Sequence, residues 1–220
     1  MRRGIAALVP MALILLASGC GGDDDDRDEV GVAPEGQAAM TLVGRIDQDG
    51  KKTRAYGYLT DIERLSRAQL FAGARFDERP SAARFTFSAS GTIRDRSILS
   101  NVIATDSEAT MHVYLQSEPA GDFRQPQSFA RGKRIASYEV RFHNIITVTG
   151  PNRGIATATG QLEQRRAERF SPPGGEERRL GHEGLVTRLS LTGSGTRTNP
   201  TLPRAFLLVA GEIVVAGNGG

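Results

Sequence analysis

The feature that most constrains the fold is the alternation of apolar and polar residues over long stretches. Between residues 84 and 93, Phe85, Phe87, Ala89 and Ile93 would share one face of a strand, with polar residues on the other. The stretch 135–148 repeats the pattern over a longer span, and its apolar face would carry Ala136, Tyr138, Val140, Phe142, Ile146 and Val148. A period of two predicts strands that bury one face.

Other segments carry the same signal. We expect further strands at 40–46, 53–60, 97–105, 109–116, 154–163, 185–193 and 205–216. Residues 47–50 and 150–154 contain Asp, Asn and Gly, which tolerate the backbone angles of tight turns. The single helix that we expect covers about 61–72, with Asp61 or Ser66 as its N-cap.

About nine strands, one short helix and no alternation of strand with helix predict an all-β fold. The chain would form an antiparallel β-barrel of about 8–9 strands, with a β-sandwich as the alternative. Glycine recurs inside the expected strands, at Gly91, Gly154, Gly160 and Gly193. Because glycine within a strand is typical of the bends of a closed barrel, the barrel is the favoured prediction.

Two segments rich in small residues carry a resemblance. Gly154-Ile-Ala-Thr-Ala-Thr-Gly-Gln-Leu162 and Leu191-Thr-Gly-Ser-Gly-Thr196 resemble the glycine-rich strands of allene oxide cyclase and dirigent-type barrels. The resemblance implies an eight-stranded barrel with an apolar cavity, and an oligomer. It is a likeness of shape and transfers no activity.

The first twenty residues predict export. Arg2 and Arg3 precede an apolar stretch at 5–16, which is the layout of a secretory signal peptide. The residues that follow, Leu16-Ala17-Ser18-Gly19-Cys20, resemble a bacterial lipobox, in which Cys20 would be lipidated and would begin the mature chain. The alternative is an ordinary secretory signal followed by an incidental cysteine.

The segment after Cys20 is acidic. Residues 20–35 contain seven Asp and Glu but a single Arg. A run of like charges without an apolar period buries too little surface to fold by itself. We therefore divide the chain into a signal peptide at 1–19, a lipidated cysteine with a disordered acidic tether at 20–38, and a single domain at 39–220.

Charge and motifs exclude several function classes. The net charge is +3, but the arginines are scattered and Trp is absent, which argues against a nucleic-acid partner. Phosphate-binding, nucleophile-elbow and zinc-protease motifs are missing from the sequence. We expect no cofactor and no metal, with His112, His143 and His182 as surface residues. An exported arginine-rich surface could still contact anionic lipid headgroups or anionic polymers of the envelope.

Four residues are candidates for binding a ligand: Asn144, Tyr138, Phe142 and Glu212. Asn144 interrupts an apolar strand face, so it would be either a structural clamp for a bulged backbone or a polar group inside a cavity. Glu212 interrupts the apolar segment 205–215, either in water or paired with an arginine such as Arg188. No catalytic residue is assigned.

Two long connections are expected, at 117–134 and 171–184. The first contains Phe123 and Phe129, which would either form a lid or pack against the sheet.

Together these features predict a protein on the extracytoplasmic side of a bacterial membrane, anchored there through Cys20. Its function would be to bind an apolar small molecule, a lipid or a partner in the cell envelope. The alternative is a cyclase-like enzyme that acts on a hydrophobic substrate in the barrel cavity, with Glu212 or Glu139 as a proton-transfer group.

Overall fold

A computed structural model describes residues 28–73, 78–199 and 201–218. The expected segments 1–19 and 20–27, including Cys20, lie outside the described residues. The described chain is all-β, as predicted. Its strands are β1 (Glu29–Val30), β2 (Ala38–Asp49), β3 (Lys52–Ile62), β4 (Phe85–Leu99), β5 (Val102–Leu115), β6 (Lys133–Gly150), β7 (Arg153–Ala167), β8 (Arg169–Phe170), β9 (Arg178–Leu180), β10 (Leu185–Asn199) and β11 (Arg204–Asn218).

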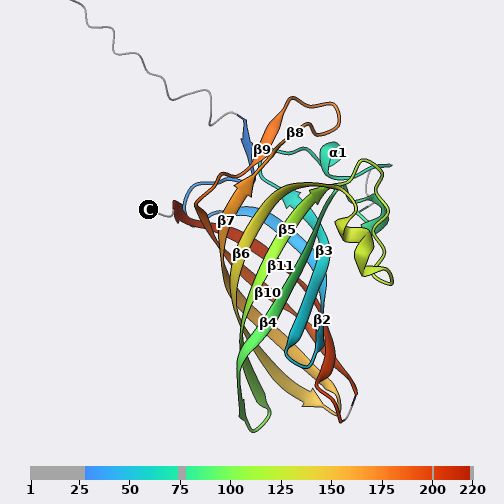
Figure 1. The fold of residues 1–220 in the computed structure, drawn as a ribbon, viewed down its shortest axis with the longest axis vertical. Coiled ribbons are helices and arrows are strands. Elements are labelled where there is room, and N and C mark those ends of the chain that lie inside the picture. The colour runs from blue at the N-terminus through green and yellow to red at the C-terminus, as the bar shows by residue number, and fades with distance from the viewer. Residues whose placement is uncertain (1–27, 74–77, 200, 219–220) are drawn as a thin grey trace, which may run out of the picture.

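Eight of these strands form a closed barrel, in the order β10-β11-β2-β3-β4-β5-β6-β7 (Figure 1). All neighbours are antiparallel, and the pairing of β11 with β2 closes the sheet, with Gly211 opposite Leu42. The barrel prediction is therefore confirmed over the sandwich alternative. A closed sheet satisfies the backbone hydrogen bonds of every strand, because it has no edge.

The predicted bounds of one strand are wrong. The predicted strand 97–105 contains the turn between β4 and β5, so the three strands expected between 84 and 116 are two long ones. Leu99 pairs with Val102, and Ser100 takes a positive φ of 55° in the turn between them. The apolar pairs Ile98-Leu99 and Val102-Ile103 on both sides of the turn concealed it, because they are typical of strand residues.

The expected helix at 61–72 is also shorter than predicted. Ile62 is the last residue of β3 and is fully buried, so the strand continues past the point where the helix was expected to begin. Only α1 (Arg67–Leu70) is helical, with Ser66 as its N-cap. The Ser66 amide donates a hydrogen bond to Gln69 Oε1 at 2.8 Å, which closes this single turn.

The two ends of the barrel differ. The tight turns after β2, β4, β6 and β10 all lie at one end, which we call the open end (Figure 1). The long connections after β3, β5 and β7 lie at the other, which we call the capped end.

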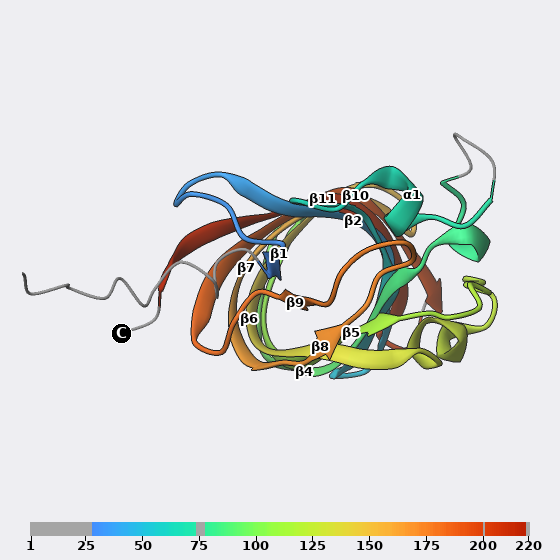
Figure 2. The same ribbon diagram turned by 90° about the horizontal axis from the view of Figure 1, so that it is seen from above.

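A small sheet closes the capped end. Strands β1, β9 and β8 form it, and in the view along the barrel they lie across the ring (Figure 2). Val30, Phe170 and Leu180 are buried beneath it, and the Phe170 ring meets the Phe85 ring edge-on at 5.6 Å. The second half of the expected tether is therefore part of the folded domain, because Glu29–Val30 pairs with β9 and β2 begins at Ala38.

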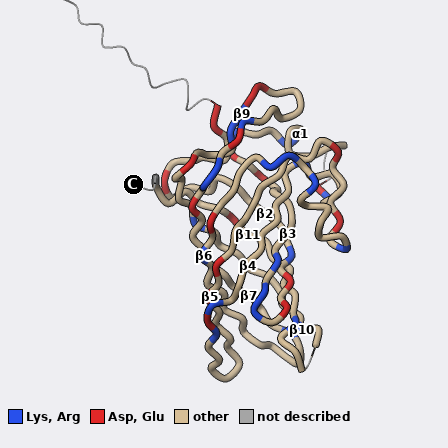
Figure 3. The backbone as a smooth tube through the Cα atoms, viewed as in Figure 1, with Lys and Arg blue, Asp and Glu red and all other residues tan. Residues whose placement is uncertain are grey.

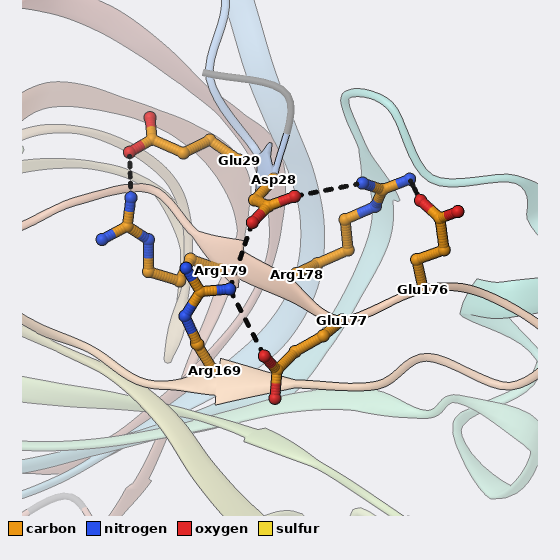
Figure 4. A network of polar contacts seen from close by, with 7 residues as sticks. All are labelled: Asp28, Glu29, Arg169, Glu176, Glu177, Arg178 and Arg179. Carbon is orange, nitrogen blue, oxygen red and sulfur yellow. Dashed lines mark hydrogen bonds and ion pairs between the residues drawn. The ribbon is translucent and has the colours of Figure 1, made fainter. Parts of the chain in front are cut away.

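Charged side chains tie this cap together (Figure 4). Arg179 contacts Glu29 at 3.3 Å, and Arg169 contacts Asp28 at 3.1 Å and Glu177 at 3.3 Å. Arg178 lies 3.8 Å from Asp28. Glu29 is only 8% exposed, so its ion pair is the best shielded from solvent. These ion pairs bind the N-terminal segment to the connection 168–184.

Gln164 fastens the cap to the barrel wall. Its side chain is buried, and Nε2 donates to the Leu180 carbonyl of β9 at 2.6 Å. Gly181 follows with a positive φ of 60°, and a Cβ there would lie 2.3 Å from Gln164 Oε1. Glycine at 181 thus permits both the backbone conformation and the close approach of Gln164.

We predict that Gln164→Leu lowers the free energy of unfolding by about 1–3 kcal/mol, because the buried Leu180 carbonyl loses its partner. Gln161→Leu is the matched control, since Gln161 lies on the same strand but is exposed. Urea unfolding of both variants would measure the difference. Equal stability of the two variants would show that the clamp does not hold the cap.

The connection 116–132 packs on the outside of the barrel. Phe123 lies 6.0 Å from Tyr56 and 4.9 Å from Phe129, measured between ring centroids, and Tyr56 belongs to the outer face of β3. The 3₁₀ helix η2 (Pro126–Ala130) carries Phe129, whose carbonyl accepts a hydrogen bond from Thr86 Oγ1 at 2.7 Å. The lid hypothesis for this connection is therefore wrong, and the packed alternative is confirmed.

Candidate functional site

The open half of the barrel contains a cavity of about 400 Å³. Apolar side chains from every barrel strand except β7 line its walls, and β7 contributes Gly154 together with Arg153 at the entrance. The deeper lining is Leu42, Phe87, Met111, Val140, Leu189, Leu191 and Val209. Towards the capped end the barrel is filled by large buried side chains, among them Phe85, Tyr138 and Leu162.

The cavity exists because the inward positions of the open half carry small residues. The interior of an eight-stranded barrel is just wide enough for side chains to fill it. Where those side chains are missing, space remains. The small residues that line the cavity are Gly44, Ala55, Ala89, Gly91, Ala109, Gly154, Gly195 and Ala205.

Phe87 forms part of the cavity floor, and two glycines make room for its ring. A Cβ at Gly44 would lie 2.8 Å from the ring, and one at Gly57 would lie 2.9 Å from it. The ring therefore packs directly on the backbone of β2 and β3. It closes the cavity on the side of the filled core.

Asn144 provides a polar group in this apolar wall. It lines the cavity, is 6% exposed, and its Oδ1 is buried without a hydrogen-bond partner. The backbone pairing is regular on both sides, with Thr105 opposite on β5 and Ala158 opposite on β7. With no bulge at this position, the structural-clamp hypothesis loses its basis, and the cavity hypothesis for Asn144 gains support.

Guanidinium groups surround the entrance. Arg96, Arg153, Arg197 and Arg204 line the cavity at the open end. Arg204 forms an ion pair with Asp49 at 3.0 Å, and Arg197 donates to the Asn199 carbonyl at 2.9 Å. Arg96 and Arg153 are exposed, and within the described residues no carboxylate pairs with either. The entrance is thus cationic while the interior is apolar.

The structure separates the four predicted ligand residues. Phe142 and Asn144 lie in the cavity wall. Tyr138 is buried in the core two residues from Val140, outside the lining, and burial raises the pKa of its phenol well above the ordinary value. Glu212 is exposed on β11, opposite Ser190, and lies on the outer face of the barrel. Strand alternation excludes Glu212 from the cavity, because its neighbour Ile213 is buried.

The other titratable candidates also lie outside the cavity. Glu139 contacts Arg165 at 2.7 Å on the outer wall, and His143 Nδ1 lies 2.7 Å from Asp106 Oδ1. His182 contacts Glu29 in the cap, and desolvation lowers the pKa of His112, with the positive charge of Arg134 adding to the effect. No group of three His, Cys, Asp or Glu suited to a metal ion occurs in the part of the chain that the structure describes.

Sequence analysis missed the arginines at the entrance and most of the inward small residues. It placed Ala89 on the buried face, and alternation could have placed Ala55 and Ala109 there too, since each lies in an expected strand. The entrance arginines come from three separate turns, so only closure of the barrel brings them together.

Comparison with protein-family models, curated proteins and solved structures found no match for this chain. The eight-stranded barrel and the cavity implied by the resemblance in shape to allene oxide cyclase and dirigent-type proteins are present, while the implied oligomer stays a prediction. Within the described residues, no helix is long and apolar enough to cross a membrane.

We predict that Asn144→Leu raises the free energy of unfolding of the empty protein by about 1 kcal/mol, because a buried amide oxygen without a hydrogen-bond partner is removed. Thr147→Leu, an exposed position on the same strand, should change stability by less than about 0.5 kcal/mol. Thermal and urea unfolding would measure both variants. A clear loss of stability in Asn144→Leu would restore the structural-clamp hypothesis.

Proposed function

We propose that this chain is an exported, lipid-anchored protein that binds an apolar small molecule or lipid inside its barrel. The observation that carries the proposal is the cavity in the open half, about 400 Å³ in volume, walled by apolar side chains and open to solvent. Its volume lies within the range of about 300–1,000 Å³ that is common for small-molecule sites.

The chemistry of the lining supports an amphipathic ligand. Transfer of apolar surface from water to the cavity wall contributes about 25 cal/mol per Å². The Asn144 amide would pair with a polar group of the ligand inside the wall. The arginines at the entrance favour an acidic group at the outer end of the ligand.

The lining supports binding better than catalysis. Among the described residues that line the cavity there is no carboxylate, imidazole, thiol or phenol, so the usual proton-transfer groups are missing from its wall. Glu212 and Glu139, the acids considered for a cyclase-like enzyme, are exposed on the outer face. The enzyme alternative therefore lacks an observation in its favour.

Ala109 and Thr110 offer a matched pair to test the cavity. Ala109 lines it, while its neighbour Thr110 is exposed on the outer face of the same strand. We predict that Ala109→Phe weakens binding of the apolar dye N-phenyl-1-naphthylamine about tenfold or more, because the new ring occupies the site. Thr110→Phe should leave dye affinity unchanged.

Fluorescence titration of the two variants and the parent chain would measure these affinities. Equal dye binding by Ala109→Phe and the parent would contradict a binding cavity. If the dye result supports the cavity, native mass spectrometry of the parent chain, purified from its host, would identify any co-purifying molecule.

The anchor has a separate test. We predict that the full chain, expressed in bacteria with radiolabelled palmitate, incorporates label and sediments with membranes, whereas Cys20→Ser does neither. Cys20 is the only cysteine in the chain, so any label held through a thioether must lie there. Label in the Cys20→Ser variant, or none in the parent, would contradict the anchor.

A further inference from the structure

The large apolar side chains that are exposed on the described chain gather around the open end. They are Ile98, Leu99, Ile145, Val148, Ile155, Leu202 and Leu208. Ile98 and Leu99 form the tip of the hairpin between β4 and β5 and are 66% and 79% exposed. Leu202 lies in the turn between β10 and β11, and Val148 is close to the turn after β6. We call these seven residues the apolar rim.

The rim includes a band on the outside of the wall as well as the tips. Ile155 of β7 pairs with Ser194 of β10, and Ser194 pairs with Leu208 of β11, so Ile155 and Leu208 lie in one row across three strands. Ile145 of β6 lies two residues before Thr147, and Thr147 pairs with Ile155 of β7, so Ile145 is close to the same row. Polar Ser194 and Thr147 lie between these residues, so the band consists of closely spaced apolar side chains. Exposed apolar side chains that gather at one end of a domain are typical of an interaction site.

The positive charge of the domain lies at the same end. The segments that form the open end are 45–54, 94–108, 148–155 and 195–206, and they contain nine Lys and Arg against five Asp and Glu. The rest of the chain from residue 28 onward contains sixteen of each. The tube in Figure 3 shows basic residues near these turns and an uncharged tip on the longest hairpin.

This combination fits the surface of an anionic bilayer. Apolar tips enter the boundary between headgroups and acyl chains, while arginines stay at the level of the phosphates. Arg96 lies two residues from Ile98, and Arg153 lies two residues from Ile155, so guanidinium and apolar groups alternate along the rim. Neither guanidinium pairs with a described carboxylate, which leaves both available to phosphate.

The same charge disfavours a second copy of this chain as the partner. An isologous dimer through the open end would face one cationic rim with another. Like charges brought together in an interface are repulsive and oppose pairing. An anionic surface is complementary to the rim in both charge and polarity.

We propose that the open end of the barrel docks on an anionic phospholipid bilayer, with the apolar rim inserted and the entrance of the cavity against the lipid. The proposal goes beyond ligand binding, because docking does not require the cavity to be occupied. It places the entrance where a lipid or another apolar molecule can pass without crossing water.

Vesicle flotation tests the proposal on the chain from residue 20 with Cys20→Ser, which keeps every described residue. We expect binding to phosphatidylcholine vesicles that contain about a third phosphatidylglycerol to be about tenfold stronger than binding to phosphatidylcholine alone. Raising the salt concentration should weaken it. The double variant Leu99→Ser/Leu202→Ser, at two exposed rim positions outside the cavity lining, should lose about tenfold in vesicle affinity while it keeps dye binding in solution.

A charge-matched pair of variants gives the control. Arg96→Gln/Arg153→Gln should weaken vesicle binding about fivefold or more, and Arg141→Gln/Arg188→Gln, which removes two exposed charges from the outer wall, should not. An equal loss of vesicle binding in both arginine pairs would overturn the proposal, as would undiminished vesicle binding by the double Ser variant of the rim. If the parent chain forms a dimer in solution and the double Ser variant of the rim does not, the rim would be assigned to self-association instead.

Discussion

The pairing of β11 with β2 is the constraint on which the rest of the structure depends. It converts a meander of long strands into a barrel without edges, and it fixes the interior at the width of eight strands. Within that fixed width, side-chain volume alone decides whether a layer is filled or empty. Phe85, Tyr138 and Leu162 fill the layers near the cap, whereas Ala89 and Ala109 leave the layers near the turns open.

The residues that stabilise the fold and the residues that form the cavity therefore lie in different halves of one sheet. The capped half holds the buried aromatic residues, the Gln164 hydrogen bond and the ion pairs of Asp28 and Glu29. The open half carries features that cost stability in an empty protein: a cavity, and an Asn144 oxygen without a partner. An apolar cavity with an unpaired amide oxygen in its wall is typical of a site that a ligand completes.

Local patterns in the sequence were sufficient for the fold class. Alternation indicated each barrel strand, because most inward side chains are apolar or small and most outward ones are polar. Asn144 on the inside and Ile155 and Leu208 on the outside are exceptions. Alternation failed at Ser100, where apolar residues flank the turn, and at Ile62, where the strand extends into the expected helix. The cap could not be predicted, since Glu29–Val30 is ordered by β9, which lies 150 residues away in the chain.

The cavity was only partly predictable for the same reason. Asn144 and Phe142 could be identified because they are on one face of one strand. Glu212 lies outside the cavity, as the alternation around Ile213 requires, so its exposure agrees with the alternative that places it in water and not with a role in the ligand site. The entrance arginines depend on which turns meet at one end, and that is a property of the closed sheet rather than of any segment.

The position of β1 in the cap has a geometric consequence for the entrance. The described chain begins at Asp28 in the cap, and the open end is at the far side of the long axis (Figure 1). Strand β4, with 15 residues, covers about 38 Å along the axis at about 3.3 Å per residue and a tilt of about 40°. The eight residues 20–27 span at most about 29 Å. A protein held at Cys20 therefore turns its entrance away from the surface that holds it, so its cargo would be exchanged with a second surface.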